Sequence, residues 1–185
     1  DRRFGKGAAV VLPDGVEVDL HRTLALGPFG LALDPERLLA GPTRGFVVGG
    51  VEVAALDRPG RFLHACYHAV LGQARPRLST LRDLALTYPA DEAEARRAHA
   101  LAREAQGEAV LATAVVSAAT VLDWAPDGPL ARWAAALRPT SRDQRWLDAH
   151  RGPNASSRAR TLLAIEALPD LRSRAAYARA VLAGA

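Results

Sequence analysis

The stretch VEVAALDRPGRFLHACYHAVLG, residues 51–72, changes its pattern halfway and decides the fold class. Its first part, VEVAAL (51–56), is a short apolar run that follows two glycines, as in a β-hairpin. From Asp57 onward the apolar residues recur at helical spacing instead. One stripe carries Phe62, Leu63, Cys66, Tyr67, Val70 and Leu71. The sequence therefore predicts a strand and, directly after it, an amphipathic helix over 58–72.

Strand signals also dominate the residues before this stretch. AAVVL (8–12), the turn PDG (13–15) and VEVDL (16–20) predict a first hairpin, because an Asp-Gly turn tolerates positive φ. GFVV (45–48) and the glycines at 49–50 predict a second hairpin with VEVAAL. Between the hairpins, Asp34 is placed to cap a short helix with Pro35 at its first position.

After residue 72 the pattern is helical. It predicts helices over 77–88, 91–122, 127–137, 142–151, 156–168 and 170–184. The longest opens at Asp91 and has Gly107 as its weakest point. Ser141 and Gln144 form a capping box for the helix over 142–151, and Asp170 is a good N-cap for the last helix.

These elements predict an α+β protein: a small antiparallel or mixed sheet followed by a helical C-terminal domain. We expect a division at residue 56, with 1–56 as the later part of a sheet domain and 57–185 as the helical domain. Neither hairpin can cover its own apolar face. The helices after residue 57, or strands upstream of this sequence, must therefore complete that core. The sequence contains no methionine, so we expect it to be a piece of a longer product.

Composition narrows the class of protein. The most apolar window, AVLATAVVSAATVL (109–122), is shorter than the roughly 18 residues of a membrane span and predicts a buried core helix. A single cysteine, Cys66, excludes an internal disulfide, fits a small core residue and predicts a cytoplasmic protein. The net charge of +4 rests almost wholly on arginines, but these are dispersed and aromatic residues are scarce. Nucleic-acid binding, which would weaken steeply with salt, is therefore not the favoured function.

The segment VEVDLHRTL (16–24) holds the first candidate site. Strand periodicity puts Glu17, Asp19 and His21 on one face, about 7 Å apart from each to the next. Carboxylates on a rigid strand suit magnesium, but a two-metal centre needs more than two of them. The alternative is the polar outer face of an antiparallel sheet.

Two further groups lie on the predicted helices. His64 and His68 are four residues apart and share the face opposite the apolar stripe, although no Cys or Glu completes a zinc motif. Asp83 lies on the side of its helix away from Leu78, Leu81 and Leu84. Ordinary solvated helix faces would look the same. The residues alone leave the chemistry open.

Three blocks of the sequence together resemble a family of bacterial nucleotidyltransferase-like proteins in the polymerase-β-type superfamily. The blocks are VEVDLHRTL (16–24), FLHACYHAVLG (62–72) and RLSTLRDLAL (77–86). The family pattern is a strand reading roughly V-E-L-H-W, a helix with L-x-x-H-A, and then R-L-R-W-L-x-D-I/L. Asp19-Leu20-His21, His68-Ala69 and, in the last block, Arg77-Leu78 with Asp83-Leu84 match it in order, and the resemblance covers residues 8–90.

The resemblance implies a Mg²⁺-dependent enzyme that transfers a nucleoside monophosphate from an NTP to an unknown acceptor. Asp19 would be the third of three carboxylates that bind the metal, and Glu17, His21, His68 and Asp83 would contact nucleotide or substrate. The family's Asp-x-Asp pair and Gly-Ser turn are absent, and Arg22 stands where the family often has an aromatic residue. We therefore expect the missing ligands on a preceding segment. The alternative is a non-catalytic scaffold that binds a protein partner through the C-terminal helices.

Overall fold

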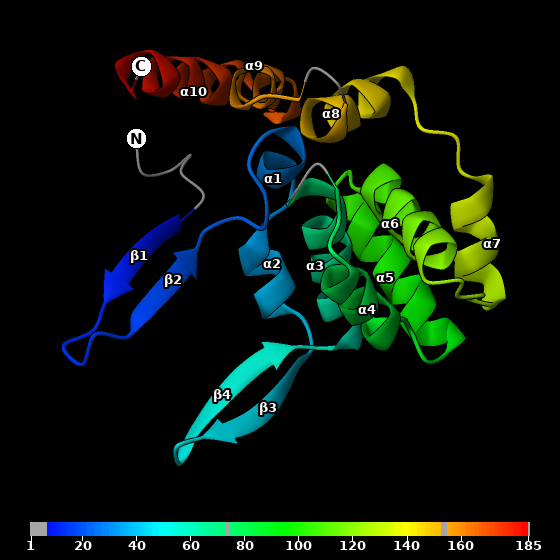
Figure 1. Cartoon of the computed structure of the whole chain (residues 1–185). Helices are drawn as coiled ribbons and strands as arrows, with labels where there is room; N and C mark the ends of the chain where they lie inside the picture. Colours follow the sequence, from blue (N-terminus) through cyan, green and yellow to red (C-terminus); the bar gives the residue numbers. More distant parts are fainter. Residues whose placement is uncertain (1–6, 73–74, 153–154, 185) are drawn as a thin grey trace.

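The computed structural model describes residues 7–72, 75–152 and 155–184 and has the α+β architecture that the sequence predicts (Figure 1). The elements are β1 (Gly7–Val11), β2 (Glu17–His21), α1 (Pro28–Ala32), α2 (Pro35–Ala40), β3 (Thr43–Val48), β4 (Val51–Leu56), α3 (Arg58–Leu71), α4 (Leu78–Thr87), α5 (Glu92–Glu104), α6 (Glu108–Val121), α7 (Gly128–Ala136), α8 (Ser141–Arg151), α9 (Ser157–Ala167) and α10 (Leu171–Gly184). The strands form two separate antiparallel hairpins, β1–β2 and β3–β4.

Both hairpins project from the helices and expose both of their faces (Figure 1). Their turns are as expected: Gly15 has φ +82° in the first, and Gly49 and Gly50 have φ +57° and +82° in the second. Apolar side chains such as Val11 and Val47 are 68% and 70% exposed, so among the described residues the helices after residue 57 do not cover these faces. The main contacts between the hairpins and the helices are those of β4 with α2 and α3. The other expected cover, strands upstream of this sequence, stays a prediction.

The helix α3 is the centre of the packed core. It contacts α4, α5, α6 and α8, and its predicted stripe is buried throughout. Cys66 is a free, fully buried thiol within that stripe, and burial raises its pKa, so it is the small core residue that the sequence predicts. Asp57 caps the helix, since its carboxylate accepts a hydrogen bond of 2.9 Å from the backbone N–H of Gly60.

The segment between the hairpins belongs to this core as well. Asp34 caps α2 with Pro35 at its first turn, as predicted. The short helix α1 was not predicted; it lies against α9 and buries Phe29 completely. Residues 25–38 therefore contribute four side chains to the helical core: Ala25, Phe29, Leu33 and Leu38. The predicted domain boundary at residue 56 stays a prediction, and this packing crosses it.

The single helix predicted over 91–122 is wrong, because two helices, α5 and α6, meet at residues 105–107. Gln106 adopts a left-handed conformation with φ +50°, and the chain turns there. Gly107 then lies directly against the ring of Tyr67 on α3, whose hydroxyl donates a hydrogen bond of 3.5 Å to the carbonyl of Ala105. Gly107, which the sequence predicts to weaken a single long helix, is thus the residue against which Tyr67 of α3 packs.

Replacing Gly107 with alanine is expected to lower the free energy of unfolding by about 2 kcal/mol, although alanine favours helix. The reason is steric, because a Cβ at Gly107 would overlap the Tyr67 hydroxyl and lie 3.0 Å from two of its ring carbons. Urea denaturation followed by circular dichroism measures the loss. In a Tyr67→Phe background the cost of the same substitution should be smaller, and equal costs in both backgrounds would contradict this explanation.

The helix α6 is the buried core helix expected from the apolar window. Seven of its fourteen residues are buried, mostly alanine and valine. Among the described residues, no helix is both long and apolar enough to cross a membrane. The small side chains of α6 instead let it pack closely against α3, α4 and α7.

The predicted capping box of α8 is displaced by one residue. Thr140, not Ser141, is the N-cap: its hydroxyl accepts a hydrogen bond of 3.1 Å from the N–H of Asp143, whose carboxylate accepts one of 3.3 Å from the N–H of Thr140. Asp143 is the acidic residue in the first turn, where a carboxylate interacts favourably with the helix dipole. Gln144 is uncharged, so the Thr140–Asp143 pair stabilises the start of α8 more than a Ser141–Gln144 pair would.

Candidate functional site

The strand β2 presents the first group of predicted site residues. Glu17, Asp19 and His21 stand opposite Val11, Ala9 and Gly7 of β1. The register is set by the turn, where Asp14 Oδ1 accepts a hydrogen bond of 3.2 Å from the N–H of Val16. All three predicted side chains are exposed. The two carboxylates and the imidazole thus share one accessible face of the hairpin.

The second group lies on the outer side of α3. His64 and His68 are both exposed, and their ring centroids are 6.3 Å apart. Gly72, just after the helix, leaves room for the second ring, because a Cβ there would lie 2.9 Å from His68 Cδ2. The prediction that the two histidines face away from the apolar stripe is confirmed.

A long-range electrostatic interaction links these two groups. Partial burial lowers the pKa of His64, and the positive charges of His68 and then His21 lower it further. His21 on β2 is therefore close enough to α3 for its charge to act on His64. We call His21, His64 and His68 the histidine cluster. The family blocks single out His21 and His68 but not His64, although its four-residue spacing from His68 was a signal for it.

Asp83 does not share in this arrangement through any polar contact. Its side chain on α4 is 59% exposed, and its carboxylate lies 3.3 Å from Arg82 Nη2 on the same helix. Within the described ranges, no hydrogen bond or ion pair joins Asp83 to Asp19 or to the histidine cluster. Leu78, which the sequence places with the buried side of α4, is 65% exposed.

The residues present do not make a complete metal site. In the part of the chain that the structure describes, no group of three or more His, Cys, Asp or Glu side chains is placed to hold a metal ion. Glu17 and Asp19 supply two carboxylates spaced along one strand, whereas a two-metal phosphoryl-transfer centre needs more ligands that converge. Asp19 as a magnesium ligand therefore stays a prediction.

The arrangement can still bind anions. The exposed imidazoles of His21, His64 and His68 offer N–H donors to an anion. Glu17 and Asp19 are exposed on the same strand as His21 and would suit a cation that accompanies the anion. Comparison of the chain with protein families, with curated proteins and with solved structures finds no match.

Proposed function

We propose that the chain is part of a nucleotidyltransferase-like protein, and that the histidine cluster and Asp19 lie where the triphosphate of an NTP binds. One observation carries the proposal. The first two blocks of the family resemblance are far apart in the sequence, yet His21 of the first block acts electrostatically on His64, within the second block and one helical turn from His68. The reaction would transfer a nucleoside monophosphate to an unknown acceptor and release pyrophosphate.

In this proposal each group has a physical role. His21 and His68 donate N–H groups to phosphate oxygens, and these bonds strengthen when the rings are protonated. His64, whose pKa is lowered, remains neutral near pH 7 and donates from one ring nitrogen only. Asp19 would hold Mg²⁺ together with carboxylates that the described residues do not provide, and the ion when bound would neutralise phosphate charge. We place the protein in the cytoplasm, where a single thiol stays reduced.

A second function is supported by a separate observation. The described residues lack a converging set of carboxylates, which is what a non-catalytic member of such a family would show. The last two helices also expose large apolar side chains: Leu162 is 58% exposed, Leu171 81% and Leu182 79%. A scaffold that docks a protein partner through α9 and α10 is therefore the alternative.

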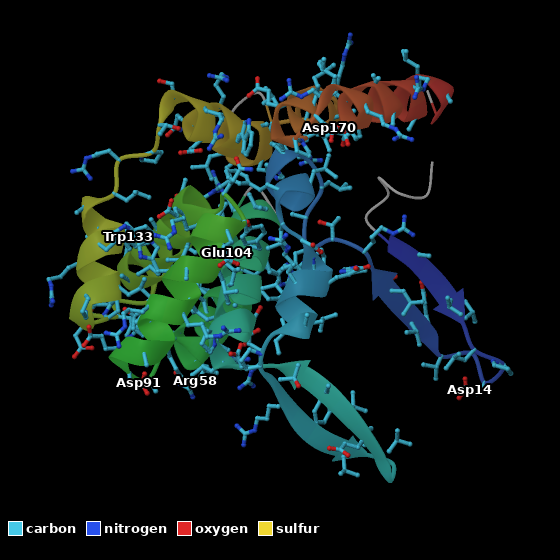
Figure 2. All side chains as sticks on the ribbon, turned by 180° about the vertical axis from the view of Figure 1, so that it is seen from behind. Asp14, Arg58, Asp91, Glu104, Trp133 and Asp170 are labelled. Atoms are coloured by element: carbon cyan, nitrogen blue, oxygen red, sulfur yellow. The ribbon has the colours of Figure 1, made fainter. Side chains whose placement is uncertain are left out.

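Calorimetric titration of the protein separates the two functions. We expect binding of Mg²⁺–NTP, and Asp19→Asn should weaken it about tenfold because one metal ligand loses its charge. Asp14→Asn is the matched control: Asp14 lies at the tip of the same hairpin, away from the helices (Figure 2), and asparagine preserves its turn hydrogen bond. The control should bind as the wild type does.

Two outcomes would contradict the enzyme proposal. If the protein binds none of the four Mg²⁺–NTPs, the scaffold function is favoured. If it binds them but Asp19→Asn and Asp14→Asn behave alike, Asp19 holds no metal and the assignment of β2 fails.

A further inference from the structure

A separate pocket lies between the segment that follows β2 and the last two helices. It has a volume of about 270 Å³ and is lined by Thr23, Leu26 and Leu31 from the first part, by Arg160 on α9, and by Tyr177 and Val181 on α10. Its walls are apolar on the side of the leucines and Val181, and polar around Arg160. Such a lining suits a small ligand with one polar end.

The polar end of the pocket contains a cation without a counter-ion. Arg160 is half-buried, and its Nη2 donates a hydrogen bond of 3.1 Å to the hydroxyl of Ser157. Its Nε is buried and has no hydrogen-bond partner. Within residues 7–72, 75–152 and 155–184, no carboxylate lies within ion-pair distance of this guanidinium. A half-buried charge of this kind is costly unless an anion joins it.

A second buried polar group, the imidazole of His150 on α8, lies close to the same pocket. His150 is only 4% exposed, and apart from the backbone of Leu71, whose hydrogen bond opposes the lowering of its pKa, its ring nitrogens have no hydrogen-bond partner among the described residues. A Cβ added to Gly27 would lie 3.1 Å from His150 Nε2 and 3.0 Å from Arg160 Cβ, so this glycine, with φ +83°, leaves the space where the two side chains meet the pocket wall. Gly27 and Arg160 both line the pocket, and His150 lies close to Gly27 without lining it.

We propose that this pocket binds a small carboxylate that carries a short apolar tail. The carboxylate would pair with the guanidinium of Arg160, which lines the pocket without a counter-ion, and its negative charge would lie near the buried His150 ring. A single unpaired guanidinium matches the single charge of a carboxylate. The tail would lie along Leu26, Leu31 and Val181, where the lining is apolar. This inference is independent of the proposed nucleotide site.

The test compares two probes of equal chain length, hexanoate and 1-hexanol, by isothermal titration calorimetry. Hexanoate should bind at least about tenfold more tightly than the alcohol, because only the acid pairs with the buried charge. Arg160→Gln should lose about tenfold or more of the hexanoate affinity. Arg158→Gln, at an exposed position on the same helix, is the matched control and should bind as the wild type does.

A second readout follows the His150 ring by NMR. Bound hexanoate should raise the pKa of His150, because a negative charge beside the ring favours its protonated form, and hexanol should leave that pKa unchanged. Arg160→Gln is expected to fold, since it removes an unpaired charge. If that variant does not fold, the two probes and the His150 titration in the wild type decide the question.

The proposal is overturned if hexanoate does not bind the wild type, if both probes bind equally, or if Arg160→Gln retains the hexanoate affinity. If hexanoate binds but the pKa of His150 does not change, the carboxylate lies elsewhere, and the proposal is overturned as well.

Discussion

Replacing Trp146 with alanine is expected to lower the free energy of unfolding by about 4 kcal/mol. Trp146 is fully buried and links three elements. Its ring meets Phe29 of α1 edge to face with centroids 5.2 Å apart, and its indole N–H donates a hydrogen bond of 3.0 Å to Glu166 Oε2 on α9. The substitution leaves a large cavity and also removes that hydrogen bond.

Urea denaturation measures this loss, and Trp133→Ala is the matched control. Trp133 is half-buried, and its ring contacts His99 with centroids 4.1 Å apart. The control should lose about 1–2 kcal/mol, because less apolar surface is removed from the interior. A loss below about 1 kcal/mol for Trp146→Ala would mean that α1 and α9 do not depend on this side chain.

The second large effect is a dependence of stability on pH that comes from His150. Burial, and then the positive charge of Arg160, lower its pKa from 6.5 to about 4 in the folded chain, against a smaller opposing effect of the Leu71 backbone. Between these two pKa values the unfolded chain binds a proton at this ring and the folded chain does not. Its contribution is therefore complete above pH 6.5 and is lost as the pH falls toward 4, by about 3 kcal/mol.

This dependence is measured as the difference between the wild type and His150→Phe, because other carboxyl groups titrate in the same range. We compare their free energies of unfolding in urea from pH 7 to pH 4. The phenylalanine variant lacks this titration, so between pH 7 and pH 4 the wild type should lose about 3 kcal/mol more than the variant does. Parallel curves would show that His150 has the same pKa in the folded and unfolded chains.

Elements whose structure depends on nearby residues were predictable from the sequence. The stripe on α3 has helical period, and the burial of Phe62 and Cys66 confirms it. The hairpins follow from turn residues that favour positive φ, such as Gly15. In both cases the decisive signal lies within a few residues of the element itself.

The errors have causes that lie far away in the sequence. The break between α5 and α6 occurs where Gly107 meets Tyr67, and no local pattern shows which distant ring will pack there. The helix α1 is too short to show periodicity, and Phe29 is held by Trp146 of α8. Strand alternation suggested a covered apolar face for the hairpins, but alternation cannot show whether another element packs on that face.

The candidate sites show the same limit. His21 and His68 each stand in a recognisable block, so the sequence could single them out separately. The effect of both side chains on His64 depends on tertiary structure, and the sequence pattern does not show it. Gly27, His150 and Arg160 come from three separate segments and share no spacing, so the sequence offered no signal for their pocket.

The central position of α3 also has a consequence for synthesis of the chain. Its apolar stripe packs against α6 and α8, both of which are translated later. At ordinary elongation rates, on the order of ten seconds pass between completion of α3 and completion of α8. During that interval the part of the stripe that packs against α6 and α8 lacks its native cover, and exposed apolar surface of this kind is prone to aggregation. Because α6 and α8 follow α3 in the sequence, the nascent chain is most prone to aggregation before these two helices have been synthesised.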